Sequence, residues 1–276
     1  MRTRFCIFLS SLLVLSLCAV SVRGQTPTGE RKVLTINGIE YAFRWCPSGN
    51  FMMGNEPGEV SVTLSRSFWM LETQVTQAMW KSVMGGLKNG AGEDLEGYFV
   101  VVDGAKEAKI QDCPEFLGDK KPIVCVSWND SQEYIKKLND MGVAPKGFKF
   151  SLPTEAQWEY ACRAGTTTAY SFGDTLTQQQ ANFGGDQTKE VGSYPANAWG
   201  LRDMHGNVWE WCQDWSGNYP GGAVTDPMGA DRGSYRVIRG GGWADFAQAC
   251  RSAFRSYYDP SLRSIDLGLR LSLVSQ

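Results

Sequence analysis

Histidine is nearly absent from the sequence, with His205 as the only one among 276 residues. This excludes a metal centre built from several histidines. The lack of any Cys-x-x-Cys pair argues further against a zinc site of the common spacings. A Ser-His-Asp triad would have to be built around His205 alone, and nothing in the sequence marks its partners. We therefore interpret His205 as a surface or capping residue.

Charge of one sign and long apolar runs are also scarce. The 27 Lys+Arg residues nearly balance the 29 Asp+Glu residues, and no basic run occurs. The sequence therefore indicates no nucleic-acid partner and no anionic membrane partner. After the N-terminal 24 residues, no segment is apolar for long enough to span a bilayer, so we expect no membrane segment after signal cleavage.

The N-terminus has the three parts of a secretory signal peptide. Arg2 and Arg4 form a basic start, the apolar run Phe5 to Val20 follows, and small residues lie around Gly24. This order predicts a signal peptide at residues 1–24. We therefore expect a secreted or periplasmic protein.

After the signal, residues 25–31 are expected to be a disordered lead-in and residues 32–276 a single domain. Two alternatives to a cleaved signal are open. Cys18 would be the anchor of a lipoprotein, although Leu17 is too large for the residue before such a cysteine. The apolar run could also be retained as a membrane anchor, although it is short.

Removal of the signal leaves six cysteines in a chain directed to an oxidising compartment. They are Cys46, Cys113, Cys125, Cys162, Cys212 and Cys250. Some of them should form disulfides, and the residues alone leave the pairing open.

Glycine and aromatic residues are plentiful, with 31 Gly, 13 Phe, 10 Trp and 10 Tyr. Helical periodicity is confined to a few short stretches. This pattern predicts an irregular, loop-rich α+β fold with an aromatic core. The strand-like runs 32–36 and 41–45 are joined by Asn37-Gly38, which predicts a β-hairpin.

Three short helices are indicated by residues that can cap them. The first should begin after Thr76 and end at Gly85. The second and third should begin after Ser127 and Thr154, each followed three residues later by a side chain that completes a capping box.

Seven short segments occur in a fixed order over about 220 residues. They are 51–54, 75–77, 122–128, 152–163, 200–211, 236–243 and Gly268-Leu269-Arg270. In this order the chain resembles the formylglycine-generating enzyme family, also called the sulfatase-modifying factor domain. The resemblance implies a single, irregular α+β domain related to the C-type lectin-like fold.

The resemblance also implies a calcium site in the segment 200–211. Its ligands would be Asp203, Gly206, Val208 and Glu210. Two carboxylates and two backbone carbonyls are oxygen ligands that calcium accepts. The alternative is that Trp209 and Trp211 face the core and that Glu210 pairs with an arginine. A second family calcium site would use Asn182 and Phe183 with an acidic loop, which is shortened in this chain.

The family enzymes carry two cysteines, separated by four residues, that bind copper(I) as thiolates and activate oxygen. Counted forward from Gly240, these positions hold Asp245 and Cys250, which leaves one thiolate for copper. Counted backward from Pro260, Cys250 instead lies near the family's structural cysteine, whose partner matches Cys162. The second alignment implies a Cys162–Cys250 disulfide and the loss of both catalytic cysteines.

Four arginines near the C-terminus could bind an anionic ligand. We expect them instead to pair with carboxylates or to stack on aromatic rings. They are Arg251, Arg255, Arg263 and Arg270.

Three functions are open to such a chain. The first is a calcium-stabilised, non-oxidase binding or accessory module that presents a loop-built groove to a peptide or glycan, for example a sulfatase peptide. The second is an oxidase that converts a sulfatase cysteine to formylglycine, with Cys250 as a remaining copper ligand. The third is a different enzyme chemistry in the same groove. A free Cys250 with a second thiolate beside it, such as Cys212, would favour the oxidase.

Overall fold

The structure of the chain is a computed structural model that describes residues 26–55, 58–95, 99–102, 106–109 and 114–276. Within these residues, no helix is long and apolar enough to cross a membrane. The predicted signal peptide and Cys113 lie outside them.

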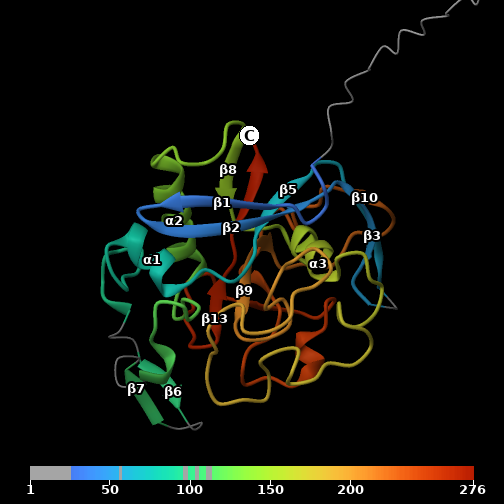
Figure 1. Cartoon of the computed structure of the whole chain (residues 1–276). Helices are drawn as coiled ribbons and strands as arrows, with labels where there is room; N and C mark the ends of the chain where they lie inside the picture. The colour runs from blue at the N-terminus through green and yellow to red at the C-terminus, as the bar shows by residue number, and fades with distance from the viewer. Residues whose placement is uncertain (1–25, 56–57, 96–98, 103–105, 110–113) are drawn as a thin grey trace, which may run out of the picture.

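The fold is centred on a five-stranded antiparallel sheet with the strand order β1-β2-β5-β14-β8. Its strands are β1 (Arg31–Ile36), β2 (Ile39–Cys46), β5 (Phe68–Leu71), β14 (Ser272–Ser275) and β8 (Phe148–Ser151). The C-terminal strand β14 lies between β5 and β8, so one sheet joins the two ends of the folded chain (Figure 1).

The β1–β2 hairpin is confirmed with its Asn37-Gly38 turn. Both turn residues have positive φ, 49° and 81°, as a tight two-residue hairpin turn requires. The domain begins earlier than residue 32, because the backbone N–H of Gly29 donates to the Trp45 carbonyl and that of Trp45 donates to the Glu30 carbonyl. Residues 29–31 are thus paired with β2 and are not a disordered lead-in.

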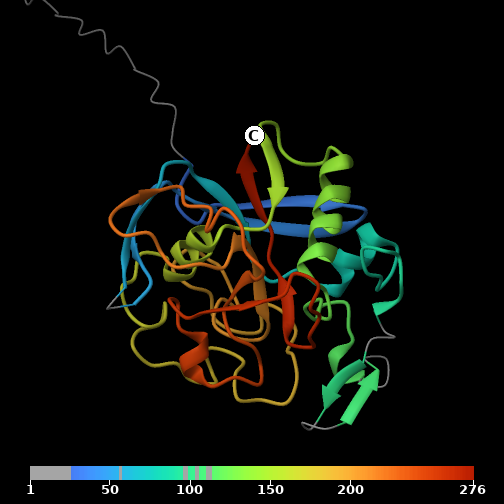
Figure 2. The same ribbon diagram turned by 180° about the vertical axis from the view of Figure 1, so that it is seen from behind.

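Three smaller sheets complete the described strands. A four-stranded sheet has the order β12-β11-β9-β13 and a three-stranded sheet has the order β10-β4-β3. Their strands are β12 (Arg255–Tyr258), β11 (Arg236–Arg239), β9 (Trp209–Trp215), β13 (Leu267–Leu269), β10 (Val224–Thr225), β4 (Val60–Leu64) and β3 (Gly49–Met53). The hairpin of β6 (Phe99–Val102) and β7 (Lys106–Lys109) lies at the end of the molecule away from the five-stranded sheet, as Figure 1 and, from behind, Figure 2 show.

The three predicted helices are confirmed with their caps. They are α1 (Gln77–Met84), α2 (Trp128–Asp140) and α3 (Glu155–Arg163). Thr76 accepts the N–H of Met79, and α1 ends at Gly85 in the left-handed conformation. Both capping boxes are formed at the starts of α2 and α3. Two single-turn 3-10 helices, η3 (Pro114–Phe116) and η4 (Ala247–Cys250), lie in the connecting loops.

Aromatic side chains make up much of the core, as predicted. Trp80 of α1 stacks on Tyr134 of α2 with 4.7 Å between ring centroids, and the Tyr134 hydroxyl lies 2.8 Å from that of Tyr41. Trp158 and Trp211 are fully buried. Trp158 belongs to α3, which contacts β3, β9 and β11 and so holds the three-stranded and four-stranded sheets together.

Candidate functional site

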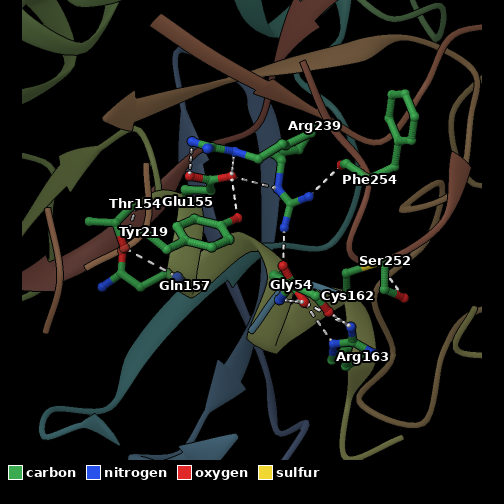
Figure 3. Close-up of polar contacts among 12 residues, drawn as sticks. Gly54, Thr154, Glu155, Gln157, Cys162, Arg163, Tyr219, Arg239, Ser252 and Phe254 are labelled. Atoms are coloured by element: carbon green, nitrogen blue, oxygen red, sulfur yellow. Dashed lines mark hydrogen bonds and ion pairs between the residues drawn. The ribbon is translucent and has the colours of Figure 1, made fainter. Parts of the chain in front are cut away.

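A chain of buried ion pairs runs along α3 and β11 (Figure 3). Glu155 and Glu159 lie one turn apart on α3, and the Arg239 guanidinium of β11 pairs with both carboxylates. On the far side, Arg163 lies 2.8 Å from Glu159. These four side chains are at most 9% exposed, so their charges are neutralised by one another rather than by water.

The outer end of this chain of ion pairs reaches the surface at Arg255. The Arg255 guanidinium binds both oxygens of Glu155 at 2.8 Å and donates to the Gly217 carbonyl at 2.7 Å. It also lies over the Tyr219 ring, 4.6 Å from the centroid, while the Tyr219 hydroxyl donates to Glu155 at 3.0 Å. A cation and an aromatic ring are therefore held rigidly at the protein surface.

A groove of about 520 Å³ opens beside this cluster, and we call it the Asp214 groove. Its walls come from Met53 and Val60 of the three-stranded sheet, from α3, from the end of β9 and from residues 217–231. The Asp214 carboxylate accepts the backbone N–H of Glu155 at 2.8 Å. Burial, together with the negative charge of Glu155, raises the pKa of Asp214 to about 7.

Sequence reasoning missed two residues of the Asp214 groove. Asp214 follows Glu210 and Cys212 at alternate positions of β9, and all three are buried. That alternation was the available signal, because it places Asp214 on the same face of β9 as Glu210 and Cys212. Tyr219 lies in an irregular loop, where no periodic pattern marks it.

The count forward from Gly240 places Asp245 and Cys250 at the family's copper positions. Asp245 accepts the backbone N–H of Gly242 and the indole N–H of Trp209, both at 2.8 Å. Cys250 is fully buried, and burial, with the nearby Asp245 carboxylate and Cys162 thiol, raises the pKa of its thiol. The Cys250 sulfur is therefore held as a protonated thiol.

The cysteines that the structure describes are free thiols. They are Cys46, Cys125, Cys162, Cys212 and Cys250. The expected Cys162–Cys250 disulfide is thus not formed: the Cys162 sulfur instead lies 3.8 Å from both ring nitrogens of His205 and 3.6 Å from the Ser252 hydroxyl. Burial raises the pKa of Cys162 to about 12.

Cys162 lies near Cys250, because both residues contact His205. The Cys162 sulfur is 3.8 Å from both ring nitrogens, and the Cys250 carbonyl is 2.8 Å from Nδ1. Cys212 lies on β9, where its sulfur is 4.0 Å from the Glu210 carbonyl.

His205 is buried, so of the two roles expected for it, surface or capping, the surface position is wrong. Its Nδ1 lies 2.8 Å from the Cys250 carbonyl, which can only accept, so the proton is on Nδ1. Its Nε2 then accepts the N–H of Ser171 at 3.1 Å and faces the Ser171 hydroxyl at 2.9 Å. Burial lowers the pKa of His205 to about 4. The imidazole is therefore a neutral link between two loops.

The segment expected to bind calcium is occupied by the side chain of Gln74. The Nε2 of Gln74 lies 3.2, 3.2 and 3.1 Å from the carbonyl oxygens of Asp203, Gly206 and Val208. In this arrangement the residues do not fit a calcium ion, because an N–H donor stands where the cation would contact the carbonyls.

Glu210 is likewise engaged with other side chains. Arg270 binds its two oxygens at 2.8 and 2.9 Å, and the Trp158 indole N–H donates to it at 2.7 Å. Trp209 and Trp211 are buried. The alternative interpretation, an arginine partner for Glu210 and inward-facing tryptophans, is therefore confirmed.

The residues of the second expected calcium site also serve as hydrogen-bond partners. The Asn182 amide donates to the Gln187 carbonyl and to the Asn207 side chain, both at 3.0 Å, and the Phe183 carbonyl accepts from Gln178 at 3.3 Å. Within the described residues, no group of three or more His, Cys, Asp or Glu side chains is placed to hold a metal ion.

The four C-terminal arginines behave as expected. Three of them, Arg255, Arg263 and Arg270, form ion pairs with carboxylates. The guanidinium of Arg251 lies 6.0 Å from the centre of the Phe254 ring. These contacts account for their charges within the fold.

Comparison with known proteins gives a family match and a fold match. Residues 41–273 match the family described as Sulfatase-modifying factor enzyme 1-like domain. The chain is 38% identical over 156 residues to the Serine/threonine-protein kinase pkn1 of Chlamydia caviae, covering 55% of this chain and 24% of that protein. It is 36% identical over 171 residues to the formylglycine-generating enzyme of Streptomyces coelicolor, covering 54% of this chain and 51% of that enzyme. The chain thus spans about half or less of these relatives.

Among solved structures, Treponema denticola variable protein 1 is similar with a TM-score of 0.72 and 26% identity, covering 90% of this chain and 99% of that chain. With its short helices, small sheets and long loops, the chain has the expected fold: a single, loop-rich α+β domain related to the C-type lectin-like fold.

Proposed function

The chain belongs to the formylglycine-generating enzyme (sulfatase-modifying factor) family, and within this family we propose that it is a non-oxidase binding or accessory module. Its ligand is a peptide or glycan held in the Asp214 groove. The predicted signal peptide supports an exported location, secreted or periplasmic.

The observation that carries this proposal is the state of Asp245 and Cys250, which the count forward from Gly240 places at the copper positions. Copper(I) favours soft thiolate ligands. Here one position is a carboxylate already bound by an indole and a backbone N–H, and the other is a buried thiol whose pKa is raised. These contacts do not support a pair of thiolates that could bind copper(I).

The chemistry of the Asp214 groove supports a ligand with both apolar and hydrogen-bonding groups. Met53, Val60 and Met228 supply apolar wall, and Met228 is 61% exposed. Arg255, whose guanidinium is paired with Glu155, and Asp214, a carboxyl group that titrates near neutral pH, are polar groups in the wall. A groove that combines apolar wall with a few polar groups is typical of ligand-binding sites, and peptides and glycans present both kinds of group.

The oxidase alternative rests on a different observation. Cys162 and Cys250 are both free thiols, and both residues contact His205. Copper(I) binding by these two thiols, with loss of their reactivity toward an alkylating reagent, would support that alternative.

The test is an activity assay run beside a binding assay. The protein is incubated with copper(I), oxygen and a sulfatase-derived peptide containing the target cysteine, with an active family enzyme as positive control. We expect no conversion of the cysteine to formylglycine by mass spectrometry. Conversion at the rate of the control would overturn the proposal.

Binding is measured with the same peptide, fluorescently labelled, and with a glycan array. We expect a signal that Met228→Lys abolishes, because Met228 lines the Asp214 groove. Met141→Lys is the matched control, since Met141 is also exposed but lies at the end of α2. If neither the peptide nor any glycan binds, the proposed ligand class is wrong.

A further inference from the structure

We propose that the side-chain amide of Gln74 takes the place of a calcium ion in the loop 203–208, so that this chain holds the loop without a metal. A second part of the proposal follows from the first. A single amide-to-carboxylate change at Gln74 should convert the loop into a calcium site.

The loop backbone requires a positive partner at its centre. Asp203, Gly206 and Asn207 have positive φ of 57°, 103° and 70°. This conformation directs the carbonyls of residues 203, 206 and 208 toward one point. A Cβ on Gly206 would lie 2.3 Å from the Asn182 carbonyl oxygen, so the loop is packed closely against residue 182. Buried carbonyl oxygens that converge must be satisfied by a cation or by N–H donors.

Gln74 supplies those donors from a distant part of the chain. It is fully buried and lies between β5 and α1. The Nε2 atom is 3.1 to 3.2 Å from all three carbonyl oxygens. Two amide hydrogens shared among three acceptors neutralise the partial charges that a cation would otherwise balance.

The direction of the Gln74 amide is fixed by a backbone donor. The N–H of Lys189 can only donate, and it donates to Asn207 Oδ1 at 2.9 Å. The Asn207 Nδ2 therefore faces Gln74 Oε1, at 2.9 Å, and this leaves Nε2 of Gln74 toward the carbonyls. If Gln74 turned its oxygen inward to bind a cation, its NH2 group would face the NH2 group of Asn207.

The carboxylates near the loop do not complete a calcium shell. Both oxygens of Glu210 are bound by Arg270, which balances its charge. Asp203 Oδ2 accepts the N–H of Gly192 at 2.6 Å, and only Oδ1 is left without a partner. Together with the three carbonyl oxygens, Oδ1 of Asp203 makes four oxygens, fewer than the six to eight that calcium takes.

The first measurement is made on the unaltered protein. Its Tm is measured in chelator and in millimolar calcium, and calcium binding is measured by isothermal titration calorimetry. We expect the same Tm in both buffers and no binding heat. A Tm that falls in chelator, or binding of calcium with one-to-one stoichiometry, would overturn the proposal.

The second measurement is made on Gln74→Glu, with Gln248→Glu as an exposed control. The carboxylate places a charged oxygen against three carbonyls, so the Tm should fall in chelator. It should then rise with the logarithm of the calcium concentration, as expected for a ligand bound only by the native state. The Tm of Gln248→Glu should not respond to calcium. A Gln74→Glu protein that folds and does not respond to calcium would refute the second part of the proposal.

Asn207→Asp is a second test of the same proposal, made at the residue whose amide donates to Gln74. The new carboxylate accepts from Lys189 but offers no donor to Gln74, which favours turning the Gln74 oxygen toward the carbonyls. This variant should also gain a calcium-dependent Tm. If Gln74→Glu does not fold in either buffer, the unaltered protein decides the first part and Asn207→Asp the second.

Discussion

Asp214→Asn should make the protein more stable at neutral and alkaline pH. Asp214 is 3% exposed and lies next to Glu155, whose backbone N–H its carboxylate accepts. Asparagine keeps an oxygen for that hydrogen bond and carries no charge. The substitution therefore removes the charge while leaving the acceptor in place.

The magnitude follows from the shift in the pKa of Asp214. An aspartate in an unfolded chain has a pKa of about 3.9. In the native state, burial and the charge of Glu155 raise the pKa of Asp214 to about 7. The native state therefore binds the proton of Asp214 more tightly than the unfolded chain does. The stability that this tighter binding contributes is fully present below about pH 4 and is lost as the pH rises through about 7. Roughly three pH units at about 1.4 kcal/mol per unit amount to about 4 kcal/mol.

The assay is urea unfolding followed by tryptophan fluorescence, with the free energy of unfolding measured from about pH 4 to about pH 9. The two proteins should be equally stable near the acid end. Asp214→Asn should be the more stable by about 4 kcal/mol at the alkaline end. Asp231→Asn is the matched control, because Asp231 lines the same groove and is exposed. A difference between Asp214→Asn and the unaltered protein that does not change with pH would refute the reasoning.

Two further substitutions test contacts that hold the site in place, and both are measured by urea unfolding. Arg270→Met leaves the fully buried Glu210 carboxylate without its partner and should lower the free energy of unfolding by about 3–5 kcal/mol. Adding Glu210→Leu to the same protein should restore part of that loss. Full stability of the Arg270→Met variant would contradict this prediction. Thr154→Ala removes the N-cap of α3 and should lower the free energy of unfolding by about 1 kcal/mol. Thr167→Ala, in an exposed loop, is the control and should have no effect. Equal losses in the two variants would count against a stabilising role of the cap.

Local features of the fold could be predicted from the sequence because their causes lie within a few residues. The Asn37-Gly38 turn requires positive φ at two adjacent positions, and both residue types tolerate it. The helix starts at Thr154 and Ser127 are fixed by bonds that span three residues. In each case the residues that predict the local structure are the same residues that form it.

The candidate site could be predicted only in part, because its contacts join distant segments. The carbonyls of the expected calcium loop are satisfied by Gln74, which lies 129 to 134 residues earlier in the chain. No pattern inside the loop could identify that partner. His205 was misread for the same reason, since its burial depends on Ser171 and on the Cys250 carbonyl. By contrast, an arginine partner for Glu210 could be anticipated, because a buried carboxylate requires one.

The buried ion pairs explain how so irregular a chain has one arrangement. Arg270 reaches Glu210 across 60 residues, and Arg239 reaches Glu159 across 80. Each member of the two pairs is fully buried. Arg239 joins β11 to α3, and Arg270, which follows β13, joins Glu210 of β9, the strand with which β13 pairs. A buried ion pair adds little net stability, but a wrong pairing would leave a charge uncompensated. These pairs therefore help to specify which strands and helix meet, and Gln74 does the same for the loop 203–208 with an uncharged amide. If the fold is specified in this way, the loops that form the Asp214 groove can change their chemistry while the frame beneath them stays in place.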